Sequence, residues 1–486
     1  MEKTSPEQVK DFFSYAAKRR EEVRSFLDGI ADEREKWIRR SQYYYNKLTE
    51  LLTFHVPPQQ RVCHFGCDTG RFLEAFQPSF GVGICLSERF AEILSERYDG
   101  YTFLNDTWEQ ELDGQTFDYI VVTNPGYLFD IQKALDRLTV LCHHRTRILV
   151  ANTNYFWEPI FAIAGKLKLR IPQPVQRQNW IPTHVIMDML LLSGMEMVRW
   201  DAHILVPFLI PGISWFINKF FSSVWPLRYF STTHIVVGRI RKKPPRPVKV
   251  SVIVPCKNER GNIAPIAERT VPVGDETELL FVDDCSTDGT GEEVERLITQ
   301  YPDMNIRCVK GPGVSKGEAV RVGFREATGD ILVILDADIA VAPEELPKCV
   351  DPVIDGYADF VNTVRFVYPQ QFGAMRLANI LGNKVFALLF SLVLQQRIGD
   401  TLCGTKAFWK KDYENIERYR DFWIWRDRWG DFEQLLGASK LGLKIVDVPV
   451  HYMERTYGET KMKNRLENGL LMLKVSLAGL FKLRLR

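Results

Sequence analysis

Residues 331–338 read ILVILDAD: five apolar residues followed by two carboxylates with one residue between them. The apolar run is partly β-branched and follows Gly329-Asp330, which predicts a buried parallel strand. Ligands of open α/β sheets bind beyond the carboxyl ends of the strands, where Asp336 and Asp338 stand. Two carboxylates at this spacing can hold one Mg²⁺ or Mn²⁺ ion against substrate phosphates. A solvated turn has the same local pattern, so the neighbouring strands must distinguish the two interpretations.

Length and composition predict a folded protein of several domains. The 486 residues suffice for two or three domains, and 45% hydrophobic and 26% charged residues are ordinary for a globular chain. A formal net charge of +2 argues against a nucleic-acid partner. The nine cysteines lack paired spacing, and Cys63 and Cys67 have no later CxxC or HxxxH partner. A zinc site is therefore not expected, and a reduced, cytoplasmic setting is favoured.

Membrane-spanning and targeting segments are not expected. No clean apolar run reaches the roughly 20 residues of a transmembrane helix. Residues 1–20 are polar and lack the apolar core of a signal peptide. Two mostly apolar segments, Ile204–Phe221 and Ala378–Leu394, are interrupted by polar residues. Each fits either a core helix or an interfacial helix, and the sequence leaves both interpretations open.

The first half of the chain predicts a doubly wound α/β domain. Residues 1–56 predict helices, and strands are expected at the start of segment 61–70 and over residues 81–87, 116–124 and 147–152. Helical patterns separate these strands, as in a parallel sheet. Segment 61–70 reads RVCHFGCDTG, a strand, a glycine-bearing turn and a helix start. Backbone amides near Gly66 and Gly70 suit a nucleotide-like ligand.

Residues 35–240 resemble class I S-adenosylmethionine-dependent methyltransferases in their fold pattern. The matching pieces are residues 62–70, 82–87 and 117–122. The resemblance implies a Rossmann-like fold with S-adenosylmethionine near Gly66 and Gly70. The chain departs from the family at positions that grip the cofactor: His64 replaces an acidic residue, and Asp68 replaces a glycine.

The end of the second strand departs further from this family. Cys85 stands where a carboxylate usually binds the cofactor ribose, and a thiol cannot accept two hydroxyl hydrogen bonds in the same way. Asp106 still suits an adenine amine. The sequence therefore favours a cofactor-free or repurposed domain over active methyl transfer.

Residues 239–247, RIRKKPPRP, mark the domain boundary. Three prolines and five basic residues exclude a central strand or helix and predict an extended linker. We expect a methyltransferase-like domain over residues 1–240, a linker over 241–247 and a second α/β domain over 248–486.

In the second half, strand ends carry polar side chains. Strands are expected over residues 248–254, 278–282, 306–309 and 331–335. Since carboxyl ends of parallel strands lie along one edge, the polar residues after them should meet there. Asp283 and Asp284 suit a base edge and ribose hydroxyls, and Lys316 suits a phosphate. These neighbours favour the metal-site interpretation of Asp336 and Asp338.

From 248 to about 465 the chain resembles family-2 glycosyltransferases of GT-A fold, in the branch of dolichyl/polyprenyl-phosphate hexosyltransferases. The motifs are VPCKNE (254–259), VDDCSTDGT (282–290), KGEA (316–319), LDAD (335–338), DTLCGTK (400–406) and the tail 448–461. The resemblance implies donor-binding roles for Pro255, Asn258, Glu259, Asp283, Asp284, Ser286, Lys316, Asp336, Ala337, Asp338 and Lys461. It implies that Asp336 and Asp338 hold the metal ion.

The resemblance also implies the reaction, inverting transfer of a hexose from a nucleotide-sugar donor to a polyprenyl phosphate. The form of the DTLCGTK motif favours UDP-glucose over GDP-mannose. Lys257, Cys285 and Thr405 depart from the usual residues. The implied catalytic positions are Asp431, Asp400 and Arg455, with Arg455 and Lys461 as a basic clamp.

Two alternatives stay open. A glycan hydroxyl acceptor would require Asp431 as a base, whereas a phosphate monoester is already ionised near neutral pH. The second alternative is a bifunctional enzyme with both methyltransferase and glycosyltransferase activity. The oligomeric state is not indicated by the sequence.

The C-terminal segment predicts contact with a membrane surface. The segment from Arg455 to Arg486 contains eight Lys or Arg residues and two Glu residues. Leucines recur in it at helical spacing from Leu466 to Leu480. This pattern suits an interfacial helix on an anionic membrane, peripheral on the cytoplasmic face. A helix packed on its own domain fits the pattern equally.

Overall fold

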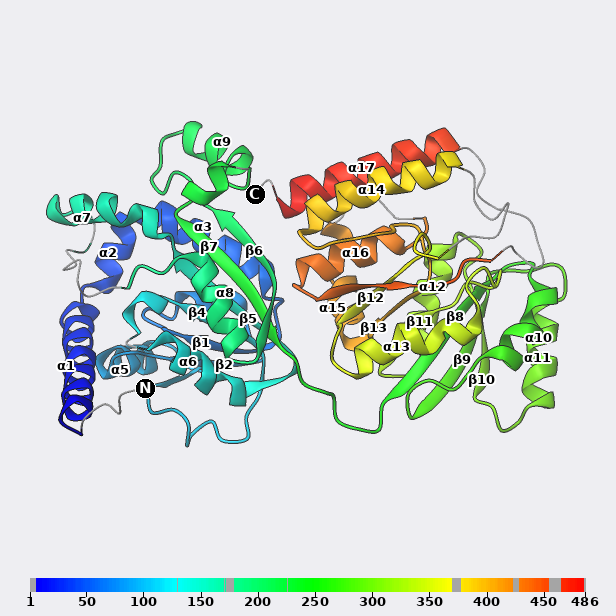
Figure 1. The fold of residues 1–486 in the computed structure, drawn as a ribbon, viewed down its shortest axis with the longest axis horizontal. Helices are drawn as coiled ribbons and strands as arrows, with labels where there is room; N and C mark the ends of the chain where they lie inside the picture. Colours follow the sequence, from blue (N-terminus) through cyan, green and yellow to red (C-terminus); the bar gives the residue numbers. More distant parts are fainter. Residues whose placement is uncertain are drawn as a thin grey trace. The chain divides into compact units, whose positions relative to one another are not determined.

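The computed structural model describes residues 6–128, 130–169, 171, 179–224, 226–368, 377–422, 428–453 and 465–484. The chain forms two units, unit 1 over Met1–Arg241 and unit 2 over Lys242–Leu485 (Figure 1). Each unit contains its own seven-stranded sheet. The predicted pair of α/β domains is confirmed, with the addition that both sheets are mixed rather than wholly parallel.

The sheet of unit 1 has the strand order β3-β2-β1-β4-β5-β7-β6. Its strands are β1 (Arg61–Phe65), β2 (Phe80–Ile84), β3 (Thr102–Leu104), β4 (Phe117–Thr123), β5 (Cys142–Thr153), β6 (Met195–His203) and β7 (Thr233–Ile240). β1 to β5 pair in parallel, and β7 runs antiparallel to β5 and β6. The order reverses beside β1, between β1 and β4, which is where such sheets bind ligands.

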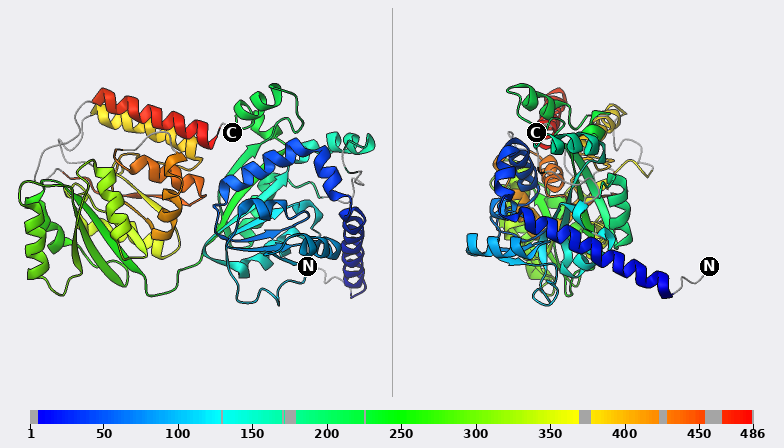
Figure 2. Two further views of the ribbon diagram at one scale, coloured as in Figure 1. Left: turned by 180° about the vertical axis from the view of Figure 1, so that it is seen from behind. Right: turned by 90° about the vertical axis from the view of Figure 1, so that its left-hand side faces the viewer.

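Helices of unit 1 cover both faces of this sheet. They are α1 (Pro6–Ala31), α2 (Arg34–Arg40), α3 (Gln42–His55), α4 (Arg71–Phe76), α5 (Glu88–Arg97), α6 (Ile131–Leu138), α7 (Glu158–Lys166), α8 (Thr183–Leu192) and α9 (Ile213–Phe220). Val62 and Val121 pack with α1, α3, α4 and α5, whereas Cys63 and Ile120 pack with α6 and α8. Successive side chains of a strand point to opposite faces of the sheet, so each strand contributes residues to two separate hydrophobic cores. Figure 2 shows α1 (dark blue) leaving the body of the unit toward its N-terminal end.

The sheet of unit 2 has the order β10-β9-β8-β11-β13-β12-β14. Its strands are β8 (Lys249–Cys256), β9 (Glu276–Asp283), β10 (Ile306–Lys310), β11 (Ile331–Ile334), β12 (Phe360–Val364), β13 (Lys406–Trp409) and β14 (Ile445–Pro449). β13 is antiparallel to β11 and β12, and the other pairs are parallel. The four strands expected in the first part of this unit are present, and β11 is fully buried.

In unit 2, helices alternate with strands along much of the chain. They are α10 (Arg260–Arg269), α11 (Thr290–Gln300), α12 (Lys316–Glu326), α13 (Leu346–Ile354), α14 (Leu377–Leu394), α15 (Lys410–Glu417), α16 (Asp431–Lys440) and α17 (Arg465–Leu483). Figure 1 shows α14 and α17 side by side (yellow and red). Single 3₁₀ turns complete the two units: η1 (Pro125–Tyr127), η2 (Thr139–Leu141), η3 (Tyr155–Trp157), η5 (Leu227–Phe230), η6 (Pro343–Glu345) and η7 (Arg420–Phe422). Within the described ranges, no helix has the length and apolarity needed to cross a bilayer.

Candidate functional site

The candidate site of unit 2 lies at the carboxyl ends of three neighbouring parallel strands. β8 pairs with β9 on one side and with β11 on the other. The loops after these strands therefore start side by side, with Asp283 ending β9 and Asp336 following β11. The predicted clustering of the polar strand ends is a consequence of this register.

Two loops at this edge are held to each other by hydrogen bonds. The backbone N–H of Asn258 donates to Ser286 Oγ (2.9 Å), and that of Thr287 donates to Asn258 Oδ1 (2.8 Å). The backbone N–H of Glu259 donates to Thr290 Oγ1 (3.0 Å). These bonds fix the predicted donor-binding residues Asn258, Glu259 and Ser286 as one surface.

The two aspartates after β9 have different environments. Asp283 Oδ1 accepts from the backbone N–H of Ser286 (3.1 Å) and is partly exposed. Asp284 is buried, and its Oδ1 accepts from the backbone N–H of Gly313 (2.6 Å). Lys257, a departure from the family pattern, lies 3.6 Å from Asp284 Oδ2. The basic side chain thus stands at the position where an aromatic residue was expected.

Cys285, which follows this pair, adopts φ +60°. That left-handed conformation favours glycine, the usual residue at this position in the family that the sequence resembles. The backbone shape of the loop is kept here although the glycine is absent.

Lys316 reaches Asp336, one of the two carboxylates predicted to hold a metal ion. Its Nζ lies 2.6 Å from Asp336 Oδ1. Burial disfavours the Lys316 charge, but Asp336, Asp431 and Asp338 together outweigh that effect and raise its pKa. Ala337, between the two aspartates, is buried in the core, which leaves the carboxylates as the polar groups of this turn. Asp338 Oδ1 also accepts from the backbone N–H of Ala340 (3.1 Å).

The donor set suits a divalent ion shared with substrate. Two carboxylates one residue apart, completed by diphosphate oxygens and water, are ligands that Mg²⁺ and Mn²⁺ accept. No group of three or more His, Cys, Asp or Glu side chains that could hold a metal occurs among the residues whose placement is described.

The 400–406 loop packs directly against this pair. A Cβ built on Gly404 would overlap Asp336 Oδ2 and would lie 2.5 Å from Lys316 Nζ. A side chain at this position would therefore enter the space between the lysine and the carboxylate. Gly404 belongs to the DTLCGTK motif, but the motif alone did not predict this contact.

Asp431 is the first residue of α16 and is buried. Its Oδ1 lies 3.1 Å from Lys406 Nζ, and Lys406 is fully buried and also donates to the carbonyl of Cys403. A helix N-terminus adds a favourable field for a carboxylate. Lys406 was not singled out from the sequence, yet a buried lysine always needs a partner, and this is the signal that could have found it.

Asp400 has a different environment from the one expected for an acceptor-side residue. It is fully buried, with Arg365 Nε 2.6 Å from Oδ2 and Arg365 Nη2 2.8 Å from Oδ1. Asn383 Nδ2 (2.6 Å) and the backbone N–H of Leu402 (2.9 Å) also donate to it. Burial raises the pKa of Asp400, but Arg365 and these hydrogen bonds outweigh burial and lower it. Its oxygens are thus engaged inside the unit rather than at the Asp336 edge.

Pro255 lies within β8 and is half-buried. Arg455 and Lys461, the predicted basic clamp, lie outside the described residues.

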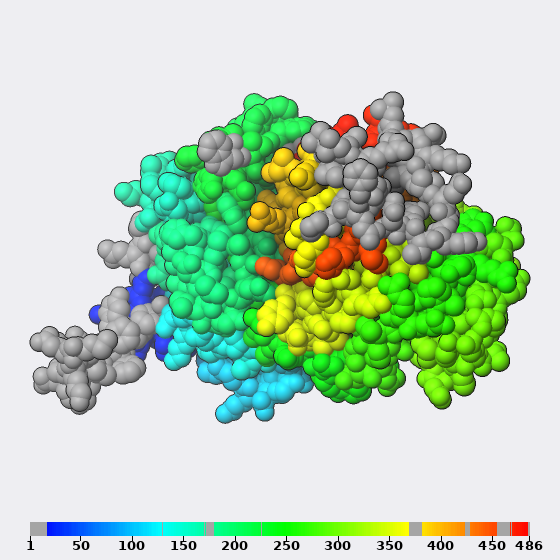
Figure 3. All heavy atoms as spheres, turned by 45° about the vertical axis from the view of Figure 1, so that its right-hand side comes forward, coloured from blue at the N-terminus to red at the C-terminus, as the bar shows by residue number. Residues whose placement is uncertain are grey.

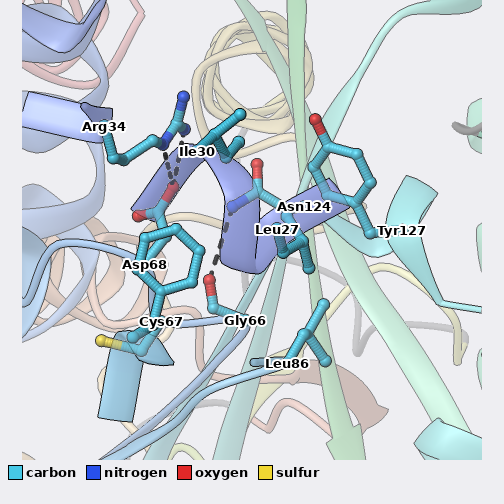
Figure 4. Close-up of a pocket in the computed structure, with 10 residues that line it drawn as sticks. Leu27, Ile30, Arg34, Gly66, Cys67, Asp68, Leu86, Asn124 and Tyr127 are labelled. Atoms are coloured by element: carbon cyan, nitrogen blue, oxygen red, sulfur yellow. Dashed lines mark hydrogen bonds and ion pairs between the residues drawn. The ribbon is translucent and has the colours of Figure 1, made fainter. Parts of the chain in front are cut away.

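Unit 1 has a cavity at its own switch point, of about 330 Å³ including the part open to solvent (Figure 4). It is lined by Leu27, Ile30, Arg34, Gly66, Cys67, Asp68, Leu86, Phe90, Asn124 and Tyr127. Arg34 of α2 reaches into it and pairs with Asp68 (Nη2 to Oδ2, 2.6 Å). The N-terminal helices therefore supply part of the wall of the cavity.

The two predicted cofactor glycines have structural reasons to be glycine. Gly66 has φ +84°, and a Cβ there would overlap the carbonyl oxygen of Thr123. Gly70 has φ +68°, and a Cβ there would lie 2.5 Å from Tyr98 Cε2. Both positions are explained without a bound ligand.

The residues present do not fit S-adenosylmethionine as the family binds it. Cys85 is fully buried and is not part of the cavity wall. The Asp68 carboxylate is occupied by Arg34, and that of Asp106 by Arg137 (Oδ1 to Nη1, 3.0 Å). Neither the ribose nor the adenine would find the carboxylate it needs, so we derive no chemistry through this cofactor.

Comparison with known proteins supports the resemblance of unit 2. Residues 251–417 match the family described as Glycosyl transferase family 2. A dolichol-phosphate mannosyltransferase from Pyrococcus furiosus is 32% identical over 223 residues, which cover 45% of this chain and 60% of that protein. An undecaprenyl-phosphate 4-deoxy-4-formamido-L-arabinose transferase from Enterobacter sp. is 27% identical over 217 residues, covering 44% and 62%. The chain spans about three-fifths of the length of these curated relatives.

Solved structures resemble each half of the chain. An S-adenosylmethionine-dependent methyltransferase from Thermotoga maritima is 18% identical, with coverage of 45% of this chain and 99% of that chain and a TM-score of 0.34. Glucosyl-3-phosphoglycerate synthase from Mycobacterium tuberculosis, solved with Mn²⁺, UDP-glucose and phosphoglyceric acid, is 20% identical, with coverage of 49% and 81% and a TM-score of 0.34.

The family resemblance read from the motifs is confirmed by the matched segment and its relatives. Residues 251–417 of unit 2 match glycosyltransferase family 2, and the relatives of this part of the chain include a dolichol-phosphate and an undecaprenyl-phosphate transferase.

Proposed function

We propose that the chain is a metal-dependent inverting glycosyltransferase that moves a hexose from a nucleoside-diphosphate sugar to a polyprenyl phosphate. The observation that carries the proposal is the cluster of Lys316, Asp336 and Asp431, with the lysine 2.6 Å from one carboxylate and within the field of the other. The residues proposed to bind phosphate, to bind metal and to lie on the acceptor side would thus act at one sheet edge. The curated relatives are transferases named for lipid-phosphate acceptors.

The nucleotide would lie along the β8 and β9 loops. Asp283, partly exposed, is available to the ribose or base, while Asp284 holds the loop through Gly313. Pro255, Asn258, Glu259 and Ser286 complete this surface. We favour UDP-glucose over GDP-mannose as the donor because of the form of the DTLCGTK motif.

The diphosphate would lie over Asp336 and Asp338. A Mg²⁺ or Mn²⁺ ion held there would neutralise charge that develops on the leaving nucleoside diphosphate. Lys316 is already beside this position and can turn from Asp336 to a phosphate oxygen. Arg455 and Lys461 are the proposed clamp on the donor diphosphate or the acceptor phosphate.

In the transfer step, an acceptor oxygen attacks the anomeric carbon as the bond to the nucleoside diphosphate breaks on the opposite face. A phosphate monoester has a second pKa of about 6 and needs no base at neutral pH. Asp431 would then position groups on the acceptor side. Its ion pair with buried Lys406 suits that role, because the pair holds the carboxylate in one place. Asp400 would act indirectly by fixing the 400–406 loop.

The acceptor would be reached at a membrane surface. Exposed leucines of α17 (Leu470, Leu473, Leu477) form a stripe, and Val385, Leu388 and Leu392 form another on α14. Lys384 and Lys474 are exposed on the same helices, so the outward faces combine apolar and basic side chains. With the basic residues of the C-terminal segment, this suits a peripheral site on the cytoplasmic face of an anionic membrane.

A thermal-shift screen tests the proposal. UDP-glucose or GDP-mannose should raise the melting temperature of the full chain with Mg²⁺ or Mn²⁺ and not after chelation. The double variant Asp336→Asn/Asp338→Asn should lose this shift. Asp303→Asn, on the exposed turn between α11 and β10 at the opposite sheet edge, should keep it. If no nucleotide-sugar stabilises the chain with either metal, the donor assignment is wrong.

A product assay tests the acceptor. Radiolabelled sugar should enter the lipid phase with polyprenyl phosphate as acceptor. Transfer to a free glycan hydroxyl with none to the lipid phosphate would contradict the acceptor assignment and favour the glycan alternative.

A further inference from the structure

Unit 1 has an apolar surface that the proposed reaction does not use. It is built from residues 155–169, which include α7, and residues 204–231, which include α9. Together they hold more than half of the exposed large apolar side chains in the described parts of the chain. Leu209 is 66% exposed, Trp215 53% and Phe216 50%. In Figure 3 the green segment 205–224 forms a raised part of the surface of unit 1.

The two segments form one surface. Trp157 Nε1 donates to the carbonyl of Phe230 (2.8 Å), and the rings of Phe156 and Phe230 lie 5.5 Å apart. Asn154 Nδ2 donates to the carbonyls of Tyr229 (2.7 Å) and Ser231 (2.8 Å). We call residues 155–169 and 204–231 the apolar surface of unit 1.

The polarity of segment 204–231 is reversed relative to a water-facing surface. Its polar residues Ser214, Asn218 and Ser222 are buried, and its large apolar residues point outward. Asn218 bonds both the N–H and the carbonyl of Val206 at 2.8 Å, and Ser214 Oγ bonds the carbonyl of Phe208 at 2.7 Å. The polar side chains thus hold the segment together from inside, and a surface in water has the opposite arrangement.

The scarcity of acidic residues on the apolar surface of unit 1 indicates the kind of partner that it fits. Segment 204–231 contains no Asp or Glu, and its charged residues are Lys219 and Arg228. Lys219 Nζ lies 5.3 Å from the ring of Trp215. Segment 155–169 has Lys166 and Lys168 against Glu158. Aliphatic and aromatic side chains with a rim of cations and almost no acids match the boundary between acyl chains and anionic headgroups.

We propose that the apolar surface of unit 1 inserts into the interfacial layer of an anionic lipid bilayer. Unit 1 then serves as a membrane-binding module. The inference goes beyond the proposed transfer reaction, which uses unit 2. It supplies a reason for a methyltransferase-like unit without a fitting cofactor site to precede a transferase with a lipid-phosphate acceptor.

Vesicle cosedimentation of the full chain tests this proposal. The patch variant is Leu209→Ser/Trp215→Ser/Phe216→Ser. The matched control is Val140→Ser/Leu191→Ser/Leu192→Ser, which removes three apolar side chains elsewhere on unit 1 that are on average more exposed. With phosphatidylcholine/phosphatidylglycerol vesicles, the patch variant should bind about a hundredfold more weakly than wild type and the control within about twofold. Equal binding of the patch variant and wild type would overturn the proposal.

A second measurement locates the contact independently of unit 2. Brominated lipids should quench a portion of the tryptophan fluorescence that is missing in Trp215→Phe, a variant that still binds vesicles. Absence of any Trp215-dependent quenching would overturn insertion even if the chain binds through α14 and α17. A lipid-independent dimer that the patch variant converts to a monomer would instead identify a second copy as the occupant.

The donor thermal shift separates this proposal from the reaction. The patch variant should keep the metal-dependent shift and should transfer sugar to a short-chain acceptor dispersed in detergent. If nucleotide-sugars fail to bind but the patch variant loses vesicle binding, the transferase assignment fails and the membrane-binding module stands.

Discussion

Lys406 Nζ lies 3.1 Å from Asp431 Oδ1, and both side chains are buried. The two residues stand on different elements, Lys406 at the start of β13 and Asp431 at the start of α16. The ion pair therefore connects the antiparallel strand β13 to the first turn of α16.

Lys406→Met should destabilise the chain. It leaves Asp431 as a buried carboxylate without its cation, which costs about 3–5 kcal/mol in other proteins. Urea unfolding of the full chain measures the loss. Lys406→Met combined with Asp431→Asn should recover a large part of it, because the pair is then removed as a whole. A single variant as stable as wild type would show that the pair contributes nothing.

Asp431→Asn distinguishes the acceptor types. With polyprenyl phosphate as acceptor, the rate should stay within about tenfold of wild type, because no proton must be removed from an ionised phosphate. With a glycan hydroxyl acceptor, loss of a general base should reduce the rate about 10²- to 10⁴-fold. Initial rates at saturating donor give the comparison, and a stability measurement in parallel separates misfolding from lost chemistry.

Gly404→Ala should impair the donor site with little effect on folding. The added methyl group displaces the ends of Lys316 and Asp336, which are flexible side-chain atoms, so the fold can adjust. The metal-dependent thermal shift by the donor should shrink or disappear. Gly382→Ala is the control, since a Cβ on Gly382 in α14 meets no atom within 4 Å. A normal donor shift in Gly404→Ala would contradict the close packing of the 400–406 loop on the metal-binding pair.

His234 should make the stability of unit 1 depend on pH. Burial lowers the pKa of His234 to about 4, whereas the unfolded chain titrates near 6.5. Between these values the unfolded state binds the extra proton, so the free energy of unfolding falls as the pH falls from 6.5 to 4. The difference corresponds to about 3 kcal/mol.

The control is His234→Gln, which removes the titrating group. Its unfolding free energy, measured against pH, should fall less steeply between pH 6.5 and 4 than that of wild type. Parallel curves for the two proteins would show that His234 is not responsible for the acid sensitivity.

The local parts of the fold were predictable from the sequence. The apolar run before Asp336 defines β11, and the other strands at the donor edge have similar β-branched runs. Parallel topology then brings Asp283 and Asp336 to one edge, whatever the details of the loops. Hence the convergence of these carboxylates at one sheet edge followed from pattern alone.

The acceptor side did not follow from pattern. β13 is a four-residue strand with a charged first residue, and its antiparallel direction is set by its neighbours β11 and β12. Asp400 forms an ion pair with Arg365, which is 35 positions away in the chain. Asp431 pairs with Lys406, which is 25 positions away. Such pairings depend on tertiary structure, so spacing in the sequence could not reveal them.

The sequence also could not show which apolar side chains of residues 204–221 are exposed. Periodicity shows that residues 204–221 are apolar with polar interruptions, and it fits a core helix and an interfacial helix alike. Only the burial of Ser214 and Asn218 shows which side faces outward.

The contacts of Asp400 have a mechanical consequence. Asn383 of α14 donates to Asp400, whose loop also places Gly404 against Asp336. Asn383, Asp400 and Gly404 thus link α14 to Asp336 at the sheet edge through one loop. Any displacement of that loop would change the space around Lys316 and Asp336.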